Sequence, residues 1–323
     1  MPQSNPQLAT QQKPPPDYSR GGFLILSRRG CRGWGGRFII QAAFFAVGAY
    51  TSGILTAPPS DAHLGGFGMP LLVGMGGAIV ASGILALFVG LITLNLRADY
   101  LAIASIGIAE IVRLFLKTEG WLTGGVRGME IGRPFEDWFG GNFTLNFLIF
   151  TIIVVAVVYT LLEVARRAPW GRVLRSIREN EDSTMAAGKS VLAFRLQAFV
   201  LGSSVMGLGG AMYGHFFGFL SPEAFRPMLA TFLVWVMLIA GGSGNNKGAL
   251  LGAFAIWLIW SGTEFVTGLL PAELSTRAGA LRILLIGVLL EIILVTRPEG
   301  LLSEAGERKR QITRDKRRAG EET

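Results

Sequence analysis

Residues 188–190 read Gly-Lys-Ser, the ending of the loop that holds nucleotide phosphates in many ATP-binding proteins. The full pattern is G-x-x-x-x-G-K-[ST], which requires another glycine five positions before Gly188, whereas position 183 is a serine. The other glycine stretch with a lysine, residues 241–248 (GGSGNNKG), has no adjacent Gly-Lys pair and follows an apolar run. Neither stretch is therefore expected to bind ATP.

Side chains for other catalytic or metal chemistry are scarce. The chain has one cysteine, Cys31, and two histidines, His63 and His215. So few cysteine and histidine side chains argue against a metal site. A single cysteine cannot form a disulfide within the chain. The Ser/His, paired-Asp and His-Glu-x-x-His spacings used by proteases do not occur in the apolar runs. We expect no cofactor, no metal and no enzymatic activity in this chain.

Two ionisable residues, Glu110 and Arg113, lie three positions apart within an otherwise apolar run. On a helix they are close enough to form an ion pair. If the run spans a membrane, each charge costs roughly 2.5 kcal/mol or more, so such groups usually face protein or a water-filled path. Two interpretations stay open: a pair that lines a transport pathway, and a structural ion pair near the membrane surface. Glu264 is a similar, solitary candidate.

A third polar candidate, His215, lies in the sequence GGAMYGHFFG, in which Gly210, Gly214 and Gly218 recur every four residues. On a helix this spacing forms a small-x-x-x-small ridge that permits close packing of a neighbouring helix. His215 is one position away from the ridge. We therefore expect it to form a hydrogen bond to a neighbouring helix rather than to contact a substrate.

The elements that must position these residues are long apolar segments. Hydrophobic residues make up 50% of the 323 positions and charged residues 16%, whereas soluble domains carry about a quarter charged residues. The 44 glycines also fit lipid-embedded helices. We predict an all-α, polytopic transmembrane helix bundle. Its eight spans are expected at residues 38–57, 69–96, 100–116, 144–163, 196–217, 227–241, 249–270 and 280–296.

These runs define a transmembrane domain over residues 38–302. Residues 1–37 are rich in proline and glutamine and then basic, which predicts a disordered or divergent N-terminal segment. Residues 303–323 are expected to form a charged cytoplasmic tail. The uncharged run 69–96 is longer than a membrane is thick, so it should tilt, or break near Gly74, Gly76 and Gly77.

Charge places the loop at 164–195 in the cytoplasm. The net charge of the chain is +8, and an excess of Lys and Arg in a membrane protein usually marks cytoplasmic loops. This loop carries Arg166, Arg167, Arg172, Arg175, Arg178, Lys189 and Arg195 against Glu179, Glu181 and Asp182. Alternating outward from it over eight spans returns both termini to the cytoplasm. Nucleic-acid binding is the weaker explanation of the basic balance.

Within that loop, residues 169–190 (PWGRVLRSIRENEDSTMAAGKS) have the pattern of an amphipathic helix. One face would carry Trp170, Val173, Leu174 and Ile177, and the other Arg172, Arg175, Ser176 and Glu179. Gly188 suits the end of a helix, where a left-handed residue is needed. The stretch is interpreted either as a solvated basic loop or as a helix on which a partner protein docks.

Residues 171–225 (GRVLRSIRENEDSTMAAGKSVLAFRLQAFVLGSSVMGLGGAMYGHFFGFLSPEAF) resemble the core signature of the membrane permease subunits of branched-chain amino-acid ABC importers, the LivM-type family. Similar stretches follow the family's order and cover most of 42–302. They are GAYTSGIL (48–55), LRADYLAIASIGIAEIVRL (96–114), IAGGSGNNKGALLGAF (239–254) and RPEGLL (297–302). The resemblance favours the docking helix.

In that family, the loop that resembles residues 171–188 docks into a cleft on a separate ATPase subunit. The resemblance therefore implies ATPase-coupling roles for Gly171, Arg172, Arg175, Ser176, Arg178, Glu179, Asn180, Glu181, Ala187 and Gly188. It also implies three kinds of partner: a homologous second permease subunit, two ABC ATPase subunits and a periplasmic substrate-binding protein. The expected function is ATP-driven import of Leu, Ile, Val or related amino acids by alternating access across the bacterial inner membrane.

At its start the sequence departs from the family. Members usually carry a further apolar segment, with Gly and Ser, before the stretch that resembles QAAFFAVGAY (41–50), where this chain has SRRGCRGWGGRFII (27–40). We therefore expect an N-terminus altered by a shifted reading frame or a wrong start. The alternatives to the amino-acid importer are a related permease for urea or short amides, a self-contained secondary transporter with Glu110 and Arg113 as its coupling site, and a membrane scaffold.

Overall fold

The computed structural model describes the helices of the bundle and most of the loops between them. The described residues are 41–59, 66–94, 96, 98–134, 142–225, 227–242, 246–268, 284–285, 287–288, 291–292 and 301–302. The segments expected at 1–37 and 303–323, the residues Cys31 and His63, and most of the expected span at 280–296 lie outside the described residues.

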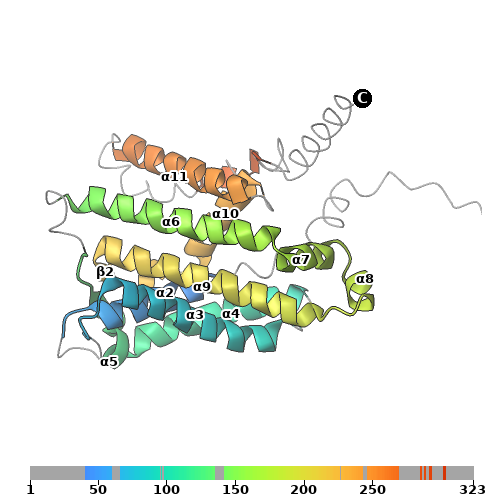
Figure 1. Cartoon of the computed structure of the whole chain (residues 1–323). Helices are drawn as coiled ribbons and strands as arrows, with labels where there is room; N and C mark the ends of the chain where they lie inside the picture. Colours follow the sequence, from blue (N-terminus) through green and yellow to red (C-terminus); the bar gives the residue numbers. More distant parts are fainter. Residues whose placement is uncertain are drawn as a thin grey trace, which may run out of the picture.

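Seven long helices make up most of the described chain, and they match the first seven apolar runs of the sequence (Figure 1). They are α2 (Gln41–Thr56), α3 (Leu71–Thr93), α4 (Ala98–Thr118), α6 (Phe143–Arg167), α9 (Val191–Phe217), α10 (Pro227–Gly241) and α11 (Asn246–Gly268). Among the described residues, α3, α6 and α9 are each long and apolar enough to cross a membrane. The prediction of an all-α polytopic membrane bundle is confirmed, and the second apolar run is one unbroken helix.

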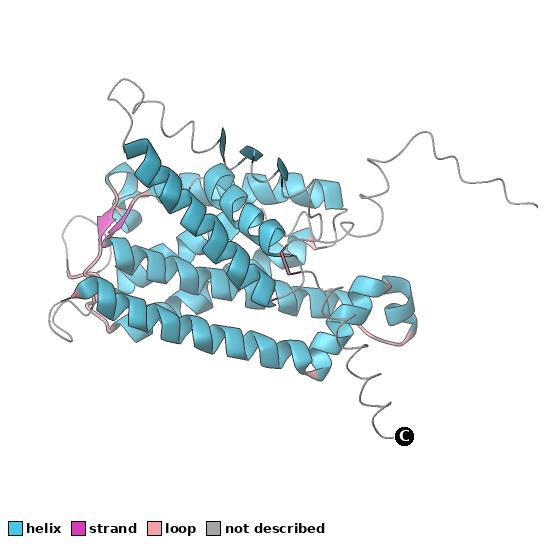
Figure 2. Ribbon diagram, turned by 90° about the horizontal axis from the view of Figure 1, so that it is seen from above, coloured by secondary structure: helices cyan, strands magenta, loops and turns pink. Residues whose placement is uncertain are grey.

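Short elements gather at the two ends of the bundle (Figures 1 and 2). At one end, which we call the foot, α7 (Pro169–Glu179) and α8 (Glu181–Ala186) connect α6 to α9. The opposite end, which we call the ladder end, carries five short elements. They are α5 (Gly120–Thr123), η2 (Gly125–Arg127), β1 (Met129–Glu130), β2 (Phe219–Leu220) and η4 (Pro222–Phe225). The strands β1 and β2 pair antiparallel, with Met129 opposite Leu220.

The centre of the bundle is a direct backbone contact between α2 and α9. A Cβ added to Gly48 would lie 2.2 Å from the carbonyl oxygen of Gly207, and one added to Gly210 would lie 1.9 Å from that of Phe45. Backbone at these distances has no room for any larger residue. Close approach of this kind is what glycine permits in membrane helices. The four-residue spacing noted in the sequence singles out Gly210 but neither Gly48 nor Gly207.

Of the three glycines expected to form a packing ridge, only Gly210 lies in this backbone contact. A Cβ added to Gly214 would lie 3.1 Å from Cδ2 of Leu220, so Gly214 faces a side chain of the ladder end. Gly218 follows α9 as its C-cap, with a φ of 69° in the left-handed region. Gly218 therefore ends the helix, and a role for it in helix packing stays a prediction.

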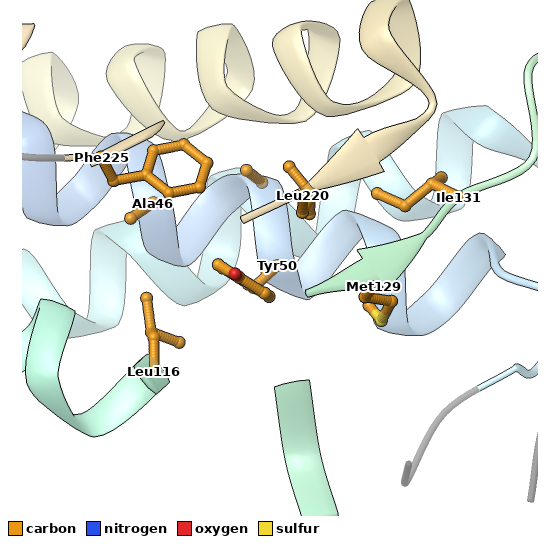
Figure 3. Close-up of a cluster of buried hydrophobic side chains, with 8 residues drawn as sticks. Ala46, Tyr50, Leu116, Met129, Ile131, Leu220 and Phe225 are labelled. Atoms are coloured by element: carbon orange, nitrogen blue, oxygen red, sulfur yellow. The ribbon is translucent and has the colours of Figure 1, made fainter. Parts of the chain in front are cut away.

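The ladder end has its own apolar core, in which residues far apart in the sequence meet (Figure 3). Leu116 of α4, Met129 of β1 and Leu220 of β2 are all buried beside Tyr50 of α2. The rings of Tyr50 and Phe225 lie 5.8 Å apart. This core fixes the loops that follow α4 and α9 against the end of α2, so the ladder end is built on the helices rather than loosely attached to them.

Helices α10 and α11 form a pair with a separate core. Val236 and Ala240 of α10 are buried against Ile256 of α11. A Cβ added to Gly241 would lie 2.0 Å from the carbonyl oxygen of Gly248, so the two helices touch through their backbones where they meet. The pair should therefore move as one unit.

The last described residues, Leu301 and Leu302, lie against the end of α10 at the foot. The backbone N–H of Leu301 donates to the carbonyl oxygen of Ala240 at 2.9 Å, and that of Leu302 to Gly241 at 3.1 Å. The final carbonyls of a helix lack partners within the helix. Leu301 and Leu302 supply them here.

Candidate functional site

The candidate site is the pair of short helices α7 and α8, which extend beyond the end of α6 (Figure 1). Pro169 begins α7, where its missing N–H leaves no hydrogen bond unmade. Asn180 separates the helices and caps α8, because its Oδ1 accepts a hydrogen bond of 3.0 Å from the backbone N–H of Ser183. The chain turns again at Gly188, whose φ is 73°. Each short helix therefore has defined ends.

The two faces of α7 differ as the sequence spacing predicts. Ile177 is buried and Trp170, Val173 and Leu174 are half-buried. The opposite face and the following turn expose the residues expected to couple to an ATPase, namely Arg172, Arg175, Ser176, Arg178, Glu179, Asn180, Ala187 and Gly188. The other two of the ten expected coupling residues are not exposed: Glu181 is half-buried and Gly171 is buried. The exposed set places charge of both signs on the surface of the foot.

Gly171 fastens α7 to the end of α6. A Cβ added to Gly171 would lie 2.3 Å from the carbonyl oxygen of Arg166 and 2.6 Å from that of Ala165. Arg175 strengthens this contact, since its Nη2 donates to the Arg166 carbonyl oxygen at 3.4 Å. A cation near the last carbonyls of a helix also interacts favourably with the helix dipole. The position of α7 is therefore set by the final turn of α6.

Two further contacts fasten the short helices to α9. The indole Nε1 of Trp170 donates to Oε1 of Gln197 at 2.9 Å. Glu181 in the first turn of α8 forms an ion pair with Arg195 of α9. A force applied to α7 or α8 would therefore reach both α6 and α9.

An open groove lies beside α8 at the foot, with a volume of about 480 Å³. Its walls combine apolar side chains from the end of α3 with charged residues from the α8–α9 region. They are Leu94, Leu96, Glu181, Met185, Lys189, Ser190, Val191, Leu192 and Arg195. The foot therefore has a concave surface beside α8.

Sequence reasoning missed Glu163, the carboxylate at the foot of α6. Arg166 donates to it at 2.7 and 2.9 Å, Arg167 at 2.9 Å, and Asn246 of α11 at 3.2 Å. The spacing of Glu163 before two arginines is a signal that could have found the pairs within the helix. No local signal indicates Asn246, which is 83 positions away.

The pair Glu110 and Arg113 lies towards the ladder end of α4, where it belongs to a larger charge cluster. Arg113 Nε donates to both carboxylate oxygens of Glu110 at 3.1 Å. Glu223 of η4 accepts from Lys117 Nζ at 2.9 Å and from Arg113 at 3.5 Å. The four charges balance and are each partly exposed. The cluster connects α4 to the loop that precedes α10.

His215 is buried and lies between α2 and the loop at the ladder end. Its Nε2 is 2.9 Å from the hydroxyl oxygen of Ser52 and its Nδ1 is 3.5 Å from the carbonyl oxygen of Gly132. The structure thus surrounds His215 with protein groups. Glu264 lies in α11, and its side chain is outside the described part of the structure. Within the described residues, no three His, Cys, Asp or Glu side chains come together in a group that could hold a metal ion.

The family described as "Branched-chain amino acid transport system / permease component" matches residues 39–294. The high-affinity branched-chain amino acid transport system permease proteins LivM of Salmonella typhimurium and Escherichia coli are each 27% identical over 305 residues, covering 87% of this chain. The chain spans only 64% of the length of these two relatives.

A third relative, the probable branched-chain amino acid transport permease protein LivM of Methanocaldococcus jannaschii, is 27% identical over 289 residues, which are 84% of this chain and 77% of that protein. No solved structure matches the chain. Since the family match covers most of the sequence and all seven long helices, this integral membrane protein belongs to the family of branched-chain amino acid transport permease components.

Proposed function

We propose that the chain is the transmembrane permease subunit of an ATP-driven ABC importer in the bacterial inner membrane. Its partners would be a homologous second permease, two ATPase subunits and a periplasmic substrate-binding protein. The observation that carries the proposal is the charged pair α7–α8, fastened to two long helices in a chain whose glycine-lysine stretches both lack the phosphate-loop pattern. Such a pair can receive the movement of an ATPase and pass it to the spans.

The proposed orientation places the foot in the cytoplasm. Arg166, Arg167, Arg172 and Arg178 all lie at this end, and Lys and Arg in excess usually mark cytoplasmic loops. The ladder end would then face the periplasm, where a binding protein delivers its ligand. Closure of the ATPases would displace α7, and the spans would open alternately to the two sides.

The proposed substrates are leucine, isoleucine and valine or related amino acids. Three relatives carry branched-chain amino acid transport in their names, and each covers more than four-fifths of this chain. Urea or short amides are the alternative within the same family. Competition by each unlabelled compound against labelled leucine uptake would separate these substrates.

Reconstitution tests the proposal. The chain is purified with the ATPase, second-permease and binding-protein products of the genes beside its own, and the complex is placed in proteoliposomes. We expect uptake of labelled leucine only when ATP and all partners are present. Uptake by this chain alone, without ATP, would overturn the proposal and support a secondary transporter in which Glu110 and Arg113 couple transport to an ion.

A further inference from the structure

We propose that Glu163 is a positioning residue that passes the movement of α7 to the α10–α11 pair through its hydrogen bond to Asn246. This inference rests on the proposed function, because it assumes that an ATPase moves α7. It assigns a role to the glycine stretch at 241–248, which includes Asn246 and lacks the pattern of a phosphate loop.

The Glu163 carboxylate is held in one orientation from its own helix. Arg166 donates to both of its oxygens, at 2.7 and 2.9 Å, and Arg167 donates to Oε1 at 2.9 Å. Charge-assisted hydrogen bonds of this kind are stronger and more directional than neutral ones. The side chain of Glu163 is 19% exposed, so solvent competes little for these bonds. The carboxylate is therefore a fixed acceptor rather than a mobile surface charge.

Asn246 is the partner from the other side of the foot. It is the first residue of α11, and its Nδ2 donates to Oε2 of Glu163 at 3.2 Å. The backbone contact between Gly241 and Gly248 lies beside it and joins α11 to α10. A displacement of Asn246 should consequently move both helices of the pair.

The upstream part of the route begins at α7. Gly171 touches the carbonyl oxygens of Ala165 and Arg166, and Arg175 donates to the latter. The side chain of Arg166 in turn holds Glu163. A shift of α7 therefore acts on the same helical turn that orients the carboxylate.

Helix α6 contacts two separately packed parts of the protein, so it can transmit movement between them. In its middle, Phe150 and Val154 pack against Met75 of α3 and Ala211 of α9. At its foot, the helix is bonded to α11, whose core with α10 is separate. Helix α6 thus connects two packed units, and rigid-body movement of one unit against the other is a common form of conformational change in proteins.

The substitution Asn246→Asp tests the inference. It places a second carboxylate opposite Glu163 and so replaces attraction by repulsion. The helix itself should tolerate the change, since an acidic side chain at a helix N-terminus is favourable. In the reconstituted complex we expect ATP hydrolysis to continue while the amount of leucine imported per ATP falls about tenfold, within the range of typical coupling free energies.

The double variant Glu163→Gln/Asn246→Asp should restore the import per ATP to within about threefold of wild type. In this variant the amide at position 163 donates to the carboxylate at position 246, so the bond is rebuilt with its direction reversed. The matched control is Asn142→Asp, the same change in the exposed residue that precedes α6 at the ladder end. It should leave the ratio unchanged.

Asn246→Ala removes the donor without adding charge, and it serves if the aspartate variant does not accumulate in the membrane. We expect a lower ratio for it too. An unchanged ratio in the Asn246 variants, even with a lower thermal stability, would show that the bond is merely structural and would overturn the inference while leaving the proposed function intact. Uptake by the wild-type chain without ATP would instead remove the proposed function and the inference together.

Discussion

Gly171 and Arg166 are in backbone contact, so close that a Cβ on Gly171 would lie 2.3 Å from the Arg166 carbonyl oxygen. The contact joins the first turn of α7 to the last turn of α6. It explains why a glycine occupies a helical position, where it is normally unfavourable by roughly 1 kcal/mol relative to alanine.

The substitution Gly171→Ala should displace α7 from α6. Overpacking of this kind costs about 1–3 kcal/mol, and here the clash is with backbone that has no alternative rotamer. We expect normal amounts of protein in the membrane but a severalfold loss of ATP-dependent uptake in proteoliposomes. Gly76→Ala in α3 is the control, because an added Cβ there meets nothing within 4 Å. Equal uptake by the two variants would show that the contact between Gly171 and Arg166 does not set the position of α7.

Charge reversal on the exposed face of α7 should uncouple ATP hydrolysis from uptake. Arg172→Glu and Glu179→Lys change side chains that point away from the bundle, so membrane insertion should be unaffected. The complementary ATPase surface would then be repelled, and repulsion between exposed charges weakens as salt rises. Copurification of the ATPase at low and high salt, with uptake per ATP, measures the effect.

The control for this prediction is Arg127→Glu, which changes an exposed arginine at the ladder end. It should leave ATPase binding unchanged. The docking assignment fails if the α7 variants bind the ATPase and import leucine as the wild type does.

The contact between α2 and α9 should be intolerant of any added carbon. In Gly48→Ala the new Cβ would lie 2.2 Å from the Gly207 carbonyl oxygen, and we expect a loss of about 1–3 kcal/mol or more in stability. The measurement is the midpoint of thermal unfolding in detergent. Gly202→Ala changes another glycine of α9 whose added Cβ meets nothing within 4 Å, and it should melt like the wild type. Similar melting of both variants would contradict the tight packing.

His215 is expected to stabilise the fold rather than to bind substrate. His215→Leu would leave the buried hydroxyl of Ser52 without its partner at 2.9 Å, which costs about 1–3 kcal/mol. Thermal unfolding should shift downward while the KM for leucine uptake stays unchanged. His215→Gln keeps a hydrogen-bonding group and should recover part of the lost stability. A raised KM with unchanged thermal stability would instead place His215 in contact with substrate.

The membrane helices can be recognised in the sequence because lipid offers no hydrogen-bond partners to the backbone. A span must therefore be a long apolar helix, and runs such as 144–163 appear as such in the structure. The two faces of α7 can also be predicted from the sequence, since Trp170, Val173 and Ile177 follow a helical period.

Contacts between helices are much harder to predict than the helices themselves. The partners Gly48 and Gly207 are far apart in the chain, and so are Glu163 and Asn246. Their meeting depends on how whole helices pack, which no local pattern encodes. Gly218 shows that a four-residue glycine spacing and the end of a helix can coincide at one residue, which the spacing alone does not distinguish.

Helix α2 begins at Gln41, the first described residue, and the last described residue, Leu302, lies at the foot of the bundle. Helix α2 runs parallel to α9, with Phe44 beside Phe199 and Ser52 beside His215, so α2 runs from Gln41 towards the ladder end. Leu302 is bonded to the foot of α10. A reporter protein fused just after Leu302 would accordingly show on which side of the membrane the foot lies, a direct readout of sidedness that needs no transport activity.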